Sequence, residues 1–143
     1  MSRLIVCLFL LLAVFLSDAA AQGEVSTPRS GDRERRAILD ALRVPVEKEL
    51  GPKLVFKVDH LKVQGGWAFL RGVPQRPGGR AVDYKGTVYA QAREDGVFDD
   101  WVCALLRKRG GKWQVVKYVI GATDVPYVGW DEEFGAPAAI FKD

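Results

Sequence analysis

The first hydrophobic pattern in the chain predicts an amphipathic helix. It should begin near Asp32, and Gly51 followed by Pro52 should end it. Pro45 has no N–H and crowds the preceding turn, so we predict one helix to about Arg43 and a short continuation to residue 50. The apolar residues recur every four positions and share one helix face: Ile38, Leu42, Val46 and Leu50.

Alternating apolar and polar residues then predict a β-hairpin. The alternation starts at residue 54 and slips by one residue at Asp59–His60, which is typical of a β-bulge. Gly65-Gly66 suits a two-residue hairpin loop, and the second strand is expected over residues 67–70, ending before Pro74. Residues 75–80 (QRPGGR) are expected to form a mobile loop.

A second hairpin is predicted over residues 101–108 and 112–120, joined by Gly110-Gly111. Both of its faces are apolar, so we expect it to be covered on both sides or to form a contact between copies. A two-residue loop would pair Leu105 with Val116, Cys103 with Tyr118, and Trp101 with Ile120.

The remaining segments predict short elements around these hairpins. Thr87 is a good N-cap for a helix over residues 88–95, and the tail after Gly121 should be irregular, with helical turns near 131–134 and 137–140. The predicted class is α+β: an N-terminal helix packed on a four-stranded antiparallel sheet made of two hairpins, with short extra helices and an irregular C-terminal tail.

The beginning of the chain predicts export. Residues 4–16 form an uninterrupted apolar run behind Arg3, too short to cross a hydrocarbon core of ~30 Å comfortably. Ala19 and Ala21 have A-x-A spacing, which predicts a signal peptide (1–21) cleaved after Ala21. A flexible lead-in (22–31) and a single domain (32–143) would follow, without a transmembrane segment, in the periplasm or secreted. An uncleaved anchor is the alternative.

The composition of the chain excludes several classes of protein and several kinds of site. The chain has 143 residues, of which 27% are charged and 48% hydrophobic, which fits one folded domain and not a disordered protein. A net charge of +3 does not indicate a nucleic-acid partner. Cys103 would be the only cysteine after cleavage, so no disulfide framework is expected. The motifs for metal and cofactor binding are absent from the sequence, and neither is predicted.

Three residues are weak candidates for chemistry. His60 is the single histidine and a candidate general base, although an edge histidine at a bulge is the simpler interpretation; the hairpin register would place it opposite Arg71. Asp99 is a second candidate base, yet its neighbour Asp100 would point to the opposite face of a strand. Cys103 lies within a strand and is expected to be buried and inert.

Aromatic and basic residues are the candidates for binding. Basic clusters occur at residues 33–36 and at 107–112, and either could meet acidic glycans or lipid headgroups, although a solvated helix face and turn tip are the simpler interpretation. The aromatic candidates could form a binding rim or could cap the core: Trp67, Trp101, Trp113, Tyr118 and Trp130.

The order of helix, hairpin, short helix, hairpin and tail resembles the cystatin-like or nuclear-transport-factor-like architecture, in which a helix crosses a curved antiparallel sheet. Residues 98–130 (FDDWVCALLRKRGGKWQVVKYVIGATDVPYVGW) also resemble an uncharacterised group of small bacterial secreted proteins. This resemblance covers the last two-thirds of the predicted mature chain. It implies no catalytic residues, because such folds host enzymes, inhibitors and adaptors alike.

Three functions are therefore open. The leading hypothesis is a non-catalytic binding or interaction module of the bacterial envelope, whose partner is an envelope protein or a second copy. The second is a pocket-bearing hydrolase or isomerase that uses His60 or Asp99 as general base. The third is a carrier of a small apolar ligand.

Overall fold

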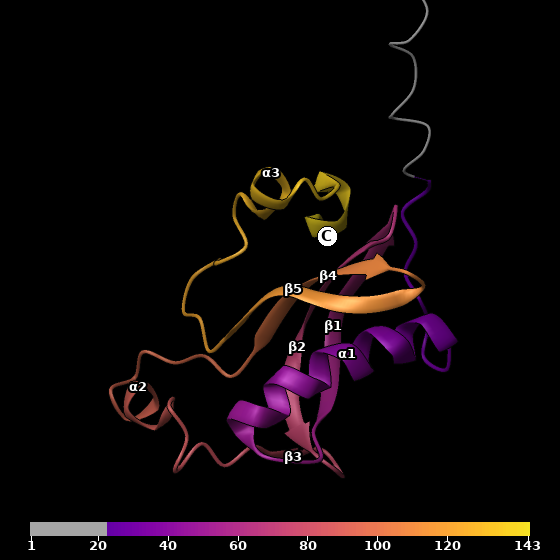
Figure 1. Cartoon of the computed structure of the whole chain (residues 1–143). Helices are drawn as coiled ribbons and strands as arrows, with labels where there is room; N and C mark the ends of the chain where they lie inside the picture. The colour runs from indigo at the N-terminus through magenta and orange to yellow at the C-terminus, as the bar shows by residue number, and fades with distance from the viewer. Residues whose placement is uncertain (1–22) are drawn as a thin grey trace, which may run out of the picture.

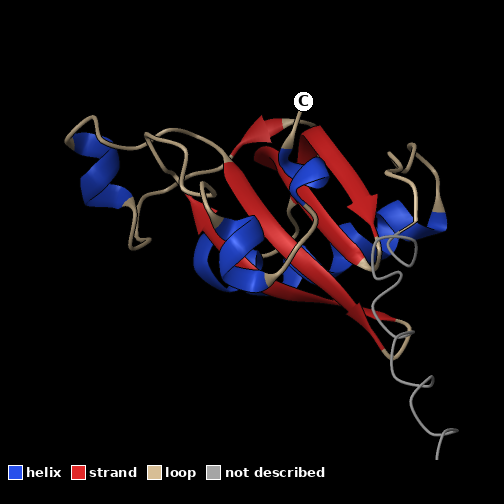
Figure 2. Ribbon diagram, turned by 90° about the horizontal axis from the view of Figure 1, so that it is seen from above, coloured by secondary structure: helices blue, strands red, loops and turns tan. Residues whose placement is uncertain are grey.

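The protein is built on an antiparallel sheet that carries helices on both faces (Figures 1 and 2). The structure is a computed structural model and describes residues 23–143. The predicted signal peptide therefore lies outside the described residues. The strand order is β1-β2-β4-β5, and β3 pairs with β2. The elements are α1 (Arg33–Leu50), β1 (Val55–Gln64), β2 (Trp67–Arg76), β3 (Arg80–Ala81), α2 (Ala90–Glu94), β4 (Val102–Arg109), β5 (Lys112–Ile120), α3 (Trp130–Phe134) and the 3-10 helix η2 (Ala138–Phe141).

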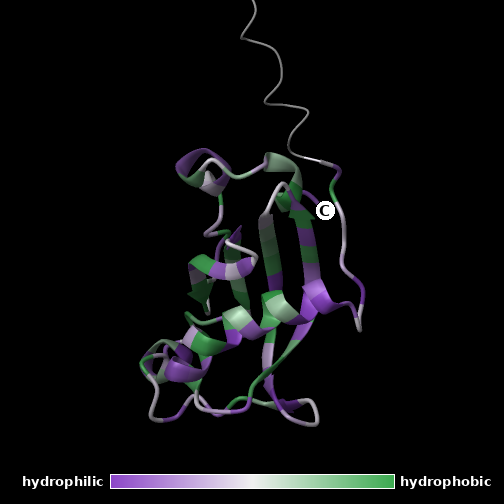
Figure 3. Cartoon of the chain, turned by 45° about the vertical axis from the view of Figure 1, so that its right-hand side comes forward, coloured by the Kyte–Doolittle hydropathy of each residue, from purple (hydrophilic) through white to green (hydrophobic). Residues whose placement is uncertain are grey.

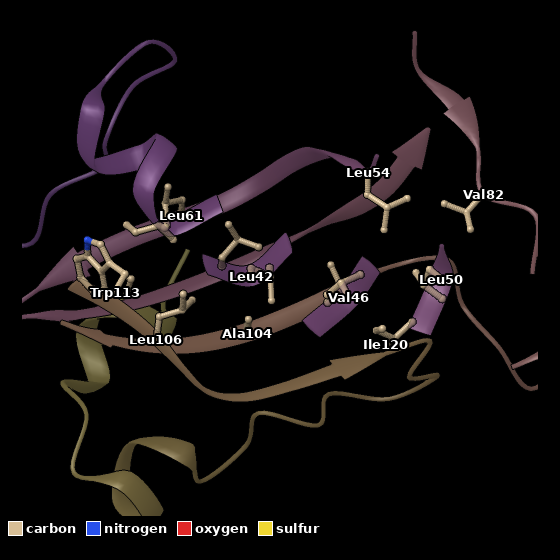
Figure 4. Close-up of a cluster of buried hydrophobic side chains, with 14 of the residues drawn as sticks. Leu42, Val46, Leu50, Leu54, Leu61, Val82, Ala104, Leu106, Trp113 and Ile120 are labelled. Carbon is tan, nitrogen blue, oxygen red and sulfur yellow. The ribbon is translucent and has the colours of Figure 1, made fainter. Parts of the chain in front are cut away.

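The predicted α+β class is confirmed, with α1 laid across the two hairpins. All four apolar residues of its periodic stripe are buried. The expected break at Pro45 is wrong, because α1 continues through this residue to Leu50. Burial of Val46 and Leu50 on the sheet offsets the hydrogen bond that the proline cannot donate. Figure 4 shows this cluster between α1 and the sheet, with Leu42, Val46, Ala104 and Leu106 facing one another.

The first hairpin contains the predicted bulge, and the register shifts between Val58 and His60. The expectation that its second strand ends before Pro74 is wrong, because β2 runs to Arg76. Since β4 pairs with β2 only as far as Gly72, Pro74 lies where one side of β2 has no β4 partner, and a proline is tolerated there. The expected mobile loop at 75–80 is instead a tight connection that returns as β3.

The second hairpin has the predicted strands and a different register. Cys103 pairs with Val119 and Leu105 with Lys117, because the register shifts between Leu105 and Leu106 and leaves Val116 as an extra residue in β5. The predicted pairs of Leu105 with Val116, Cys103 with Tyr118 and Trp101 with Ile120 are therefore wrong. Because of this bulge, Tyr118 and Ile120 pack in the cluster beneath α1.

The C-terminal tail covers the second face of the sheet. Here α3 and η2 lie over the strands (Figure 2) and bury Trp130 and Ile140 against Phe69, Cys103 and Leu105. Both helical turns occur within one residue of the predicted positions. The apolar hairpin is thus covered on both sides by parts of the same chain.

Tyr84 makes most of the contacts that hold the segment between the two hairpins. The Thr87 hydroxyl donates to the Tyr84 carbonyl at 2.7 Å and accepts from the Tyr89 N–H at 3.2 Å, which closes a turn before α2. The prediction that Thr87 is the N-cap of a helix over residues 88–95 is wrong, because α2 begins at Ala90 and its N-cap, Tyr89, makes no side-chain capping hydrogen bond. The Tyr84 hydroxyl donates to Asp100 at 2.5 Å. Phe98 packs on the rings of Tyr84 and Tyr89.

We expect Gly121→Ala to destabilise the protein by about 2–4 kcal/mol in chemical denaturation. Gly121 has φ +79°, and an added Cβ would lie 2.1 Å from the Phe98 ring. The matched control is Gly111→Ala, where φ is +75° and no atom lies within 4 Å of the added Cβ. Only backbone strain acts in the control, so it should cost about 1 kcal/mol. Equal losses in the two variants would contradict the close packing of Phe98.

Candidate functional site

His60 is buried beneath the C-terminal tail. Its side chain follows the β1 bulge and lies opposite Arg71, as the sequence predicts. The residue is 7% exposed, and Nε2 donates to the carbonyl oxygen of Ile140 at 2.7 Å. The ring packs at 5.5 Å from the centroid of Phe69, and Nδ1 lies 3.5 Å from the Asp143 carboxylate. His60 is therefore engaged in holding the tail on the sheet.

Arg71 contacts two groups of the same tail and one carboxylate of β1. Its Nη1 donates to the Tyr127 hydroxyl at 2.9 Å and its Nη2 donates to Asp143 at 2.6 Å, while Nε lies 3.7 Å from the Asp59 carboxylate. The hydrogen bond from Arg71, with its positive charge, holds the pKa of Asp143 below its usual range. We call His60, Arg71, Tyr127 and Asp143 the tail clamp.

Cys103 completes a row of three chemistry-bearing residues across the sheet. The register pairs His60 with Arg71 and Arg71 with Cys103, so the row crosses β1, β2 and β4. Cys103 is 0% exposed, and burial raises the pKa of its thiol to about 12. A thiol of this kind is not a nucleophile near neutral pH, and Cys103 packs with Phe69 and Trp130 instead.

Asp99, the other candidate base, lies in the exposed loop before β4. Its backbone N–H donates to the carbonyl of Gly121 at 3.2 Å, whereas neighbouring Asp100 accepts from Tyr84. Two cavities, of about 190 and 350 Å³, lie at the start of α1 and beside α2, and both are lined in part by charged side chains. Neither of these two cavities is lined by His60 or Asp99.

The five candidate aromatic residues are divided by the sheet. Trp113 and Tyr118 lie on the α1 side, whereas Trp67, Trp101 and Trp130 lie on the tail side. Trp130 is only 1% exposed, and Trp67 and Trp113 are also buried. The Trp101 indole donates to the Ala122 carbonyl at 2.5 Å. Burial, reinforced by the nearby carboxylate of Glu49, raises the pKa of Tyr118. These residues contribute to two cores and do not form one binding rim.

The two basic clusters meet at one end of the molecule. Lys108 Nζ lies 3.6 Å from the Glu34 carboxylate, which joins the β4–β5 turn to the first turn of α1. Figure 1 shows this turn beside the start of α1, and Figure 3 shows how hydrophilic that helix end is. We call this surface the basic end, and its six cationic residues are all exposed: Arg33, Arg36, Arg107, Lys108, Arg109 and Lys112.

Two of these cations rest on buried tryptophans. The Arg107 guanidinium lies 4.8 Å from the centre of the Trp67 ring, and the Lys108 ammonium lies 5.7 Å from that of Trp113. Each indole is anchored in a different hydrophobic cluster. The aromatic residues after the two Gly-Gly turns thus both support positive charge on β4, at the tip of the second hairpin.

Within residues 23–143, no group of three or more His, Cys, Asp or Glu side chains is arranged to hold a metal ion. No helix of this part of the chain has the length and apolar character needed to span a membrane. Comparison with protein-family models, curated proteins and solved structures gave no match to this chain. The resemblance to cystatin-like or nuclear-transport-factor-like proteins therefore stays a prediction.

Sequence reasoning found half of the tail clamp. It singled out His60, and the hairpin register correctly placed Arg71 opposite it. Tyr127 and Asp143 carry no periodic signal, since they belong to an irregular tail whose path over the sheet is set by tertiary packing. Glu34 was visible only as a helix-start carboxylate, and its contact with Lys108 needs the placement of α1 on the sheet.

We expect Asp143→Asn to lower the free energy of unfolding at neutral pH and to change it little in acid, measured by urea denaturation across a pH series. The folded-state pKa of Asp143 is lowered, so its contact with Arg71 stabilises the protein above the unfolded-state pKa and is lost as pH falls through the folded value. Asp124→Asn, in an exposed part of the same tail, is the control. A loss at neutral pH no larger than that of the control would contradict the tail clamp.

Proposed function

We propose that this chain is a non-catalytic binding module of the bacterial envelope, which recognises an acidic partner through its basic end. The observation that carries the proposal is the meeting of six exposed cations from two segments more than seventy residues apart. The six exposed cations outnumber the two carboxylates of the same end, Asp32 and Glu34, whereas the whole chain has a net charge of only +3. The basic end is therefore a localised patch on a nearly neutral protein.

The tail clamp supports a non-catalytic role. His60 and Arg71 make their contacts with the chain's own tail, and Cys103 is buried with a raised pKa. The side chains best suited to acid–base or nucleophilic chemistry are thus used to stabilise the fold. The apolar run at residues 4–16 supports a location outside the cytoplasm, periplasmic or secreted.

Affinity capture from an envelope extract tests this function. Immobilised protein should retain an envelope component that elutes as rising salt screens the charges. Arg109→Gln combined with Lys112→Gln should abolish retention. These side chains flank the Gly110-Gly111 turn, which is surrounded by open space, so we expect the double variant to keep the fold. The matched control removes two exposed cations far from the basic end, by Lys57→Gln with Lys85→Gln.

The control should retain the component as the unaltered protein does. Equal retention by the two double variants, or no salt-sensitive retention at all, would overturn the proposed function. Light scattering on the same samples identifies the case in which the retained partner is a second copy of this chain.

A further inference from the structure

We infer that the partner of the basic end is an anionic membrane surface, whose phospholipid headgroups bind the exposed cations. This inference rests on the proposed function and adds the class of partner. It is carried by a second feature of the same end, namely where the chain leaves the domain.

The described chain starts next to the hairpin tips. The carbonyl of Gly23 accepts a hydrogen bond from the side chain of Gln64 at 2.9 Å, and Ser26 pairs with Val63 through two backbone hydrogen bonds of 2.8 Å. The Lys108 N–H donates to the Gly66 carbonyl at 2.7 Å, which joins the β1–β2 turn to the basic strand end. The first described residue, Gly23, therefore lies beside the tip of the β1–β2 hairpin, which adjoins the basic end.

The apolar sequence before Gly23 supports a bilayer as the partner of the basic end. The apolar run at 4–16 is the part of the chain suited to enter hydrocarbon, and only residues 17–22 separate it from Gly23. Six residues span at most about 20 Å when fully extended. During export, or with an uncleaved anchor, Gly23 is therefore held within about that distance of the membrane, on the side of the domain that carries the basic end.

The chemistry of the basic end suits lipid headgroups. Its cations project from one hairpin end and one helix end, so they can meet a surface of phosphates without a shaped pocket. The Arg107 and Lys108 side chains lie over the rings of Trp67 and Trp113, which hold the two charges at this surface. Lys and Arg residues near an anionic membrane each contribute roughly a fivefold factor to binding, over a range limited by the Debye length.

Vesicle sedimentation tests the inference. Residues 22–143 are used, because both hydrophobic clusters of the described chain are complete within 23–143, and a cooperative thermal transition confirms the fold of each sample. We expect binding to phosphatidylglycerol-containing vesicles at about 0.1 M salt, loss of binding at about 1 M salt, and no binding to pure phosphatidylcholine. Arg109→Gln with Lys112→Gln should weaken binding about 30-fold, whereas Lys57→Gln with Lys85→Gln should change it less than threefold.

Three outcomes would overturn the inference: equal binding to both kinds of vesicle, equal weakening by both double variants, or no binding to vesicles of either kind. Competition with inorganic phosphate separates a lipid surface from a site for free phosphate, because millimolar phosphate should leave vesicle binding unchanged. If the protein does not bind vesicles while its retention of an envelope component still depends on the basic end, the membrane is the wrong partner and the proposed function stands. If both fail, the proposed function is wrong as well.

Discussion

The structure depends on covering a sheet that is apolar on both faces with segments of a single chain. The α1 stripe covers one face, and the C-terminal tail covers the other with Trp130 and Ile140. Cys103 is a free thiol, so it contributes to the tail-side core through packing and not through a crosslink. Hydrophobic burial on two sides is therefore the main source of stability, and the tail is a structural layer of the domain.

This arrangement explains why the chain's chemistry-bearing residues are committed to the fold. A tail with only two short helices, α3 and η2, leaves many of its polar groups without partners of its own, so it needs partners on the sheet. His60 donates a hydrogen bond to the Ile140 carbonyl. Arg71 donates to Tyr127 and Asp143. The Lys62 ammonium donates to the Lys142 carbonyl at 2.5 Å. The proposed binding role uses the other resource of the molecule, which is the positive charge gathered at the hairpin tips and the start of α1.

The sequence predicted what local periodicity can encode. The four-residue period predicted the α1 stripe. Alternation and the Gly-Gly loops predicted both hairpins and the bulge beside His60. The tail turns were also predicted. The register of the second hairpin was not, because β5 is apolar in both phases, so the alternation does not show that a bulge at Val116 changes the pairing. Pro45 was misjudged for a similar reason, since its local penalty is outweighed by packing of residues beyond it.

Native-state hydrogen exchange along a denaturant series tests the central claim, that the tail is part of the cooperative fold. The amides of Ala136 and Ile140 are hydrogen-bonded within the tail, and β4 supplies the central reference amides. The account predicts that both sets exchange only through the same global opening, with the same dependence on denaturant. Exchange of the two tail amides through a much smaller opening, while the β4 amides stay protected, would contradict it.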